Sequence, residues 1–167
     1  DTPWRGVKRP RTAPPGFYLP WAFRGDVTMT FSDLLSAAKT AERETRSVDV
    51  TVAGELLELT FTELPGMDWA SITAKHPPRT NAPVDLRYGY NVHGVCADAA
   101  AVNGTIVQAG ESVEVKPEEW AELVGVLSGH DLNRVCDAIF LLNEWLPQQR
   151  VTAAKKALKG SSKKSSS

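Results

Sequence analysis

The sequence predicts a mostly helical α+β domain in which one β-hairpin packs on a C-terminal αα-hairpin and on shorter helices. Between residues 115 and 146, apolar residues recur at spacings of three and four in two successive runs, separated only by Ser128-Gly129-His130. Between residues 48 and 61, apolar residues alternate with others on both sides of Gly54, which is typical of a β-hairpin. A lone hairpin is marginally stable in water, so we expect it to lie on the helices.

The first 28 residues are expected to lie outside the fold, as a disordered, Pro-rich leader. Their five prolines disfavour any helix or central strand. The first methionine is Met29, a helix signature follows it, and Arg24-Gly25-Asp26 can be encoded by a purine-rich stretch of ribosome-binding type. We therefore hypothesise that the native start is Met29. The alternative is a Pro-rich arm that docks on a partner.

A single globular domain is expected over residues 29–146. A thin apolar face predicts a first helix over residues 30–44, with Ser32 as its cap. Leu64-Pro65-Gly66 is expected to end the hairpin's second strand. The pattern between the two hairpins then predicts a short helix at 67–75, an exposed loop at 80–87, a second short helix at 92–102, and an irregular stretch with strand-like pieces at 105–115.

The αα-hairpin has start signals for both of its helices. Pro117 suits a first helical turn, and the acidic residues that follow it favour the positive end of the helix dipole. Ser128, followed by Asp131, is placed to cap the second helix. Leu146-Pro147 is expected to end that helix, which leaves residues 147–167 as a flexible Lys/Ser-rich tail.

Most aromatic side chains of the folded body are expected to be part of its core. They are Phe31, Phe61, Trp69, Tyr88, Tyr90, Trp120, Phe140 and Trp145.

The charge is distributed as an acidic body with basic ends. Residues 1–28 and residues 159–167 each carry +3, so the formal total of −1 leaves −7 for residues 29–158. A body this acidic is a poor surface for nucleic acid, whose phosphates need clustered cations. No apolar run is long enough to span a membrane, so we expect neither a membrane nor a specific nucleic acid among the partners.

The candidate residues for chemistry form no convincing set. Two cysteines are too few for a disulfide-stapled secreted protein, so a reducing cytosol is favoured. His93 and Cys96 have a spacing that can hold zinc, with Cys136 and His76 as further ligands, but Cys136 lies on an apolar helix stripe. A nucleophile pair drawn from Cys96, His93 and His130 has no evident orienting group. We assign no catalytic, metal or cofactor-binding residue and expect no enzyme and no cofactor.

The break at residues 128–130 could also mimic a helix-turn-helix, which would make the chain a small DNA-binding regulator. However, the second helix presents a set of polar residues that is too acidic to favour a major groove. That set is Asn133, Arg134, Asp137 and Glu144.

The order of elements and small motifs resembles a known family. A first helix, a hairpin and a Leu-Pro then Trp helix are followed by His76-Pro77-Pro78-Arg79 and Gly89-Tyr90-Asn91, and a helix with Glu119-Trp120 precedes one that ends in Leu142-Asn143. Over residues 29–145 this is similar to the tail assembly chaperones of actinobacteriophages with long, non-contractile tails. Residues 1–28 have no counterpart in the resemblance.

The resemblance implies a role without catalysis in the host cell cytoplasm. Such chaperones bind the tape measure protein, help recruit the major tail tube protein during tail morphogenesis, and are absent from the mature virion. The family's genes often make a longer, frameshifted product, which is a further expected partner, and the Lys/Ser-rich end is where that frameshift would fall. The first helix and the hairpin edge are the expected contact surfaces. The alternative is a phage structural module, such as a head–tail connector or a minor tail protein.

Overall fold

The structure is a computed structural model, and it describes residues 29–162. The expected leader at 1–28 and the last five residues of the expected tail lie outside the described residues. The chain divides into two compact units, residues 1–41 and 42–167. The predicted domain of residues 29–146 spans parts of both units, and each unit is described by itself.

The first unit contributes one described helix, α1 (Phe31–Thr40). Its cap is Thr30 and not Ser32, because Thr30 and Asp33 form a reciprocal capping box in which each side chain accepts from the other residue's backbone N–H. The helix also ends before the expected Glu44. The carbonyl of Glu44 instead accepts a hydrogen bond from the N–H of Glu63 at 2.8 Å, which extends the hairpin pairing.

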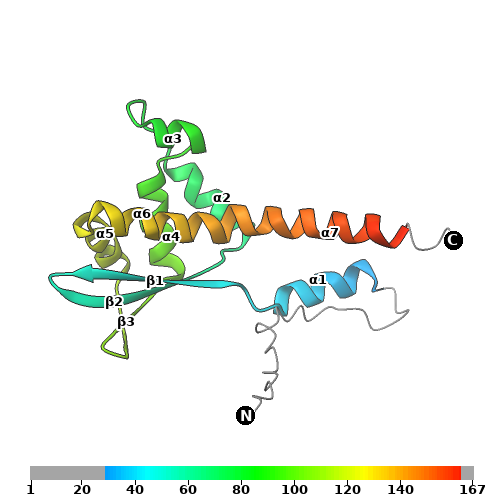
Figure 1. Ribbon diagram of the computed structural model, residues 1–167, viewed down its shortest axis with the longest axis horizontal. Helices are drawn as coiled ribbons and strands as arrows, with labels where there is room; N and C mark the ends of the chain where they lie inside the picture. The colour runs from blue at the N-terminus through cyan, green and yellow to red at the C-terminus, as the bar shows by residue number, and fades with distance from the viewer. Residues whose placement is uncertain (1–28, 163–167) are drawn as a thin grey trace, which may run out of the picture. The chain divides into compact units, whose positions relative to one another are not determined.

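The second unit contains one antiparallel sheet of four strands, in the order β1-β2-β3-β4 (Figure 1). The predicted hairpin is confirmed, and its two-residue turn at Ala53-Gly54 has positive φ at both positions. The irregular stretch expected at 105–115 is a second hairpin, with the same turn geometry at Ala109-Gly110. The strands are β1 (Thr45–Val52), β2 (Glu55–Thr62), β3 (Thr105–Gln108) and β4 (Glu111–Val113).

One face of the sheet is buried and the other is polar. Val48 pairs with Leu59 in the register, and both side chains are buried, as the alternation predicted. On the opposite face, Ser47 and Thr60 share a hydroxyl–hydroxyl hydrogen bond of 2.6 Å. The buried face of the sheet consists of Val48, Val50, Leu59, Phe61 and Ile106.

Five helices of the second unit precede its C-terminal segment. The short helices predicted near 67–75 and 92–102 are confirmed as α2 and α4. The exposed loop expected at 80–87 is wrong, because Pro83 begins a helix there and Gly89, with a φ of 82°, ends it in the left-handed region. The helices are α2 (Gly66–Lys75), α3 (Pro83–Tyr88), α4 (Val92–Asn103), α5 (Pro117–Val126) and α6 (Gly129–Phe140).

Helix α4 lies between the sheet and the smaller helices α2 and α3 (Figure 1). The two helices of the predicted αα-hairpin follow each other across Leu127 and Ser128, and Ser128 caps α6 as expected, accepting from the N–H of Asp131 at 3.1 Å. Their main contacts are with other elements: α5 packs on α4, whereas α6 packs on β1 and α4. The mostly helical α+β class is confirmed.

The expected stop at Leu146-Pro147 is wrong. A π-helical turn, Leu141–Trp145, leads from α6 directly into α7 (Leu146–Ser162). The N–H of Leu146 donates five residues back, to the carbonyl of Leu141. This wider turn gives room to the proline ring, which would clash with the preceding turn of a regular α-helix. Arg150 then ties α7 to the hairpin through Glu44 and Glu63.

Most of the aromatic side chains are part of the core, as expected: Phe61, Tyr90 and Trp120 are buried, and Trp69 and Tyr88 pack against them. Trp120 is buried and its ring lies 6.1 Å from that of Phe61, so the expectation is confirmed there. Phe31 is an exception: it is 75% exposed, and no residue of α1 is buried. Trp145 is 43% exposed, whereas Leu142 in the same π-helical turn is fully buried.

Close packing at the end of α4 leads to a first prediction. A Cβ at Gly104 would lie 2.5 Å from the carbonyl oxygen of Ala100 and 2.7 Å from the Trp120 ring. Gly104→Ala should therefore lower the free energy of unfolding by about 2 kcal/mol, measured by urea denaturation.

The matched control for this substitution is Gly125→Ala. A Cβ at Gly125, inside α5, meets nothing within 4 Å, so alanine should leave stability unchanged or raise it by up to about 1 kcal/mol. Equal effects of the two substitutions would contradict the packing argument.

Candidate functional site

A pocket of about 640 Å³ opens between α2, α3, α4 and α6. Its size lies in the range of ligand-binding pockets, and most of its lining is apolar. The floor comes from the buried faces of α4 and α6, which contribute Val95, Cys96, Cys136 and Ile139. Among the cavities of the described residues, we take this pocket as the candidate functional site.

Aromatic side chains form one continuous wall of the pocket. Trp69 meets Tyr90 edge-on, with ring centroids 6.0 Å apart, and Tyr88 meets Phe140 edge-on at 4.8 Å. The two tyrosine rings, 6.1 Å apart, join these pairs. Edge-on geometry is favoured between aromatic rings, so the wall is pre-formed from residues of α2, α3, α6 and the α3–α4 link.

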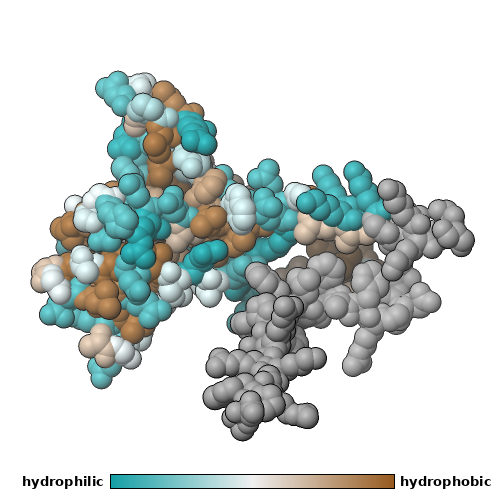
Figure 2. Space-filling view, in the orientation of Figure 1, coloured by the Kyte–Doolittle hydropathy of each residue, from teal (hydrophilic) through white to brown (hydrophobic). Residues whose placement is uncertain are grey.

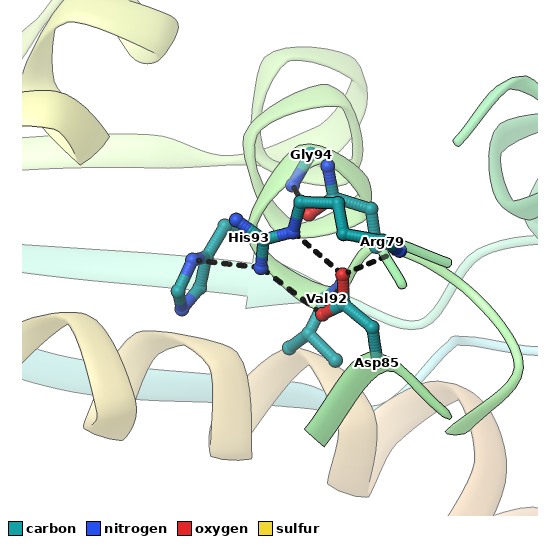
Figure 3. Close-up of polar contacts among 6 residues, drawn as sticks. Arg79, Asp85, Val92, His93 and Gly94 are labelled. Carbon is teal, nitrogen blue, oxygen red and sulfur yellow. Dashed lines mark hydrogen bonds and ion pairs between the residues drawn. The ribbon is translucent and has the colours of Figure 1, made fainter. Parts of the chain in front are cut away.

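A buried carboxylate holds the rim of the pocket together (Figure 3). Asp85 on α3 is fully buried and accepts from the backbone N–H and the Nε of Arg79, at 3.1 and 2.6 Å, through Oδ2. Its Oδ1 accepts from Nη2 of Arg79 at 3.1 Å and from the N–H of Val92 at 3.2 Å. These bonds connect the segment before α3 with the start of α4, so one side chain fixes both ends of the rim.

The same contacts set the ionisation of Asp85. The hydrogen bond from the Arg79 side chain, aided by the backbone donors of Arg79 and Val92, holds the pKa of Asp85 well below its usual range despite burial. Asp85 therefore stays a carboxylate at neutral pH. Sequence reasoning missed this residue, although the Pro83 and Gly89 signals around it could have indicated a short helix.

The two cysteines come together in the floor of the pocket. A hydrogen bond with Cys136, together with burial, raises the pKa of the Cys96 thiol well above its ordinary range. A protonated, buried thiol is a poor nucleophile. Both cysteines are free thiols, and Cys136 occupies the buried stripe of α6 as the sequence predicted.

The three histidines do not join these cysteines in a single constellation. His93 lines the pocket, with Nδ1 3.5 Å from Nη2 of Arg79. His76 instead pairs with Asp98 at 2.9 Å, and its ring lies against Gly94. His130 is exposed at the start of α6. Within residues 29–162, no three His, Cys, Asp or Glu side chains are grouped in a way that could hold a metal ion.

The motifs that carry the family resemblance occupy joints of the fold. The N–H of Asn91 donates to the carbonyl of His76 at 2.8 Å, and the Asn91 side chain caps α4 by accepting from the N–H of Gly94. The hydroxyl of Tyr90 donates to Glu144 at 2.7 Å. Asn143 accepts from the N–H of Leu64 at 2.8 Å. These residues therefore have structural roles around the pocket.

Comparisons of the chain with protein families, curated proteins and solved structures found no match. Among the described helices, none is long and apolar enough to cross a membrane.

The buried carboxylate leads to the second prediction. Asp85→Asn places an amide nitrogen against the donors of Arg79, so the free energy of unfolding at pH 7 should fall by about 3 kcal/mol. The exposed Asp49, whose side chain makes no hydrogen bond or ion pair with a described residue, provides the control, and Asp49→Asn should change stability by less than about 0.5 kcal/mol.

The contribution of Asp85 to the free energy of unfolding should depend on pH. The pKa of Asp85 is lower in the folded chain than in the unfolded chain, so its stabilising contribution is complete above the ordinary aspartate pKa of about 4. That contribution is lost as the pH falls toward the folded-state pKa. The difference in free energy of unfolding between wild type and Asp85→Asn should therefore become smaller from pH 7 to pH 2, as measured by urea denaturation. A gap that stays constant would contradict the ionised Asp85.

Proposed function

We propose that this chain is a tail assembly chaperone of a long-tailed, non-contractile bacteriophage. It binds the tape measure protein in the host cell cytoplasm and helps recruit major tail tube subunits. It works without catalysis or cofactor, associates with a longer, frameshifted form of itself, and is left out of the mature virion. The proposal rests on the resemblance carried by His76-Pro77-Pro78-Arg79, Gly89-Tyr90-Asn91 and Leu142-Asn143.

One surface observation supports this proposal more than any other. Helix α1 has no buried residue, and its apolar stripe is exposed: Phe31 by 75%, Leu34 by 52% and Leu35 by 47%. The helix does not need a partner to start, because its capping box is local. An exposed apolar stripe on a self-capped helix is suited to binding another protein's apolar face.

The other expected contact surface, the free edge of β1, is a weaker candidate. Nη1 of Arg134 on α6 donates to the backbone carbonyl of Asp49 at 2.7 Å, so part of that edge already has a partner. We therefore place the main contact with the tape measure protein on the stripe of α1.

The third prediction tests this contact. The double substitution Leu34→Ser and Leu35→Ser removes apolar area from the stripe, so it should weaken binding of the tape measure protein at least about tenfold. The measurement is a pull-down titration of the full chain against the tape measure protein from the same phage genome. The control is Val102→Ser on α4, which is also exposed, by 60%, and lies outside the stripe.

Wild-type chain that fails to associate with the tape measure protein would contradict the proposed function. Equal binding by the stripe variant and the Val102 control would contradict the role of α1. Purified virions separate the chaperone from a structural module: the chain should be absent from them, whereas a connector or minor tail protein would be present.

A further inference from the structure

The apolar lining of the pocket continues onto the outer surface of the molecule. Val84 of α3 lines the pocket and is still 52% exposed, and the same short helix exposes Leu86 by 59%. Apolar side chains reach the surface around α3 in Figure 2. A small molecule would be enclosed on most sides, whereas apolar surface that runs out of a pocket is suited to a protein segment with an anchoring side chain.

The rim of the pocket has charged side chains of both signs, and one of them has no ion-pair partner in the described residues. The positive charge of Arg79 is balanced by the buried carboxylate of Asp85. On the opposite side, α6 contributes Asn133 and, one turn later, Asp137. The Asp137 side chain is exposed, and it forms no ion pair within residues 29–162, although Arg46 and Arg134 line a second, smaller pocket beside it. Among the Asp, Glu, Lys and Arg side chains that line this pocket, Asp137 is thus the one without an ion-pair partner, and its charge is negative.

The net charge of the chain reinforces this asymmetry. Residues 29–158 carry −7, so a positively charged segment is attracted to the body over a distance as well as at the rim. A complementary segment has an apolar group for the floor and a cation for Asp137.

We propose that this pocket binds a segment of the tape measure protein, the client of the proposed chaperone, in which a large apolar side chain lies next to a lysine or arginine. The apolar side chain packs against the wall formed by Trp69, Tyr88, Tyr90 and Phe140, and the cation meets Asp137. The inference rests on the proposed function, because the client is the tape measure protein. The pocket is thus a second contact surface besides the stripe of α1, and it selects those segments of the client that combine an apolar side chain with a cation.

The test uses overlapping synthetic peptides that cover the tape measure protein from the same genome. Binding of each labelled peptide to the full chain is measured by fluorescence anisotropy. The peptides that bind should be those with Trp, Phe, Leu or Ile beside Lys or Arg. Their binding should weaken as salt rises, because the Asp137 contact is exposed and screened.

Two variants and two matched controls locate the binding. Val84→Glu puts a charge on the apolar surface and should weaken peptide binding at least about tenfold. Asp137→Lys should weaken it and reduce its salt dependence, because the local contact is lost and the body becomes less negative. Val126→Glu and Glu122→Lys make the same changes on exposed positions of α5 and should bind like wild type. Because Val84 and Asp137 are both exposed, circular dichroism of all four variants should match that of wild type.

The outcomes separate this inference from the proposed function. If the tape measure protein binds, but Val84→Glu and Asp137→Lys bind its peptides like the controls, the pocket inference is wrong and the chaperone role stands. If neither the protein nor any peptide binds wild type, the proposed function fails and the inference fails with it. If Val84→Glu instead abolishes a self-association seen by sedimentation, the occupant is a second copy of this chain and the inference is overturned.

Discussion

The close packing of α4 is the constraint on which the rest of the second unit depends. Val95, Cys96, Ala99 and Ala100 are all buried, and most of these side chains are small, so neighbouring elements approach the helix closely. Helices α2, α3, α5 and α6 and strand β2 all contact it. Its last residue, Asn103, donates to the carbonyl of Thr62 at the end of β2. This one helix therefore contacts the sheet, contributes to the floor of the pocket, and donates to Asp85 through the N–H of Val92.

Elements with a strong local signal could be predicted from the sequence, and those with a brief signal could not. Apolar residues alternate along both strands of the β1–β2 hairpin and recur at spacings of three and four along α6, so both elements could be predicted. The second hairpin is short, but its Ala109-Gly110-Glu111 repeats Ala53-Gly54-Glu55 of the first, and both turns have the same geometry. That repeat was an available signal for a second hairpin. Helix α3 has six residues, too few for a periodic pattern, and only its Pro and Gly boundaries mark it.

The candidate site was less accessible to sequence reasoning, because it depends on tertiary contacts. Periodicity placed Cys136 on a buried stripe, and spacing placed His93 near Cys96, but neither shows that both cysteines share a pocket floor. Arg79 was visible as part of a motif, yet its partner Asp85 lies in a stretch expected to be a loop. Burial of that carboxylate changes Arg79 from a free surface cation into a neutralised part of the rim. The sign of the remaining charge, set by Asp137, follows only from this pairing.

The π-helical turn explains how the pocket, the sheet and α7 are held in one arrangement. The wider turn lets successive side chains reach different partners: Asn143 accepts from the N–H of Leu64 after β2, and Glu144 accepts from Tyr90 in the pocket wall. Burial and the Glu144 contact raise the pKa of Tyr90 far above its usual value, so its hydroxyl remains a donor to Glu144. Pro147 lies two residues after this turn, and the helix continues through it although proline usually kinks or breaks a helix. A proline that usually indicates the end of a helix here lies beside a π-helical turn that connects two helices. The Leu142-Asn143 motif lies in this turn and outside the pocket lining, so its residues hold the neighbouring elements in place and do not line the pocket.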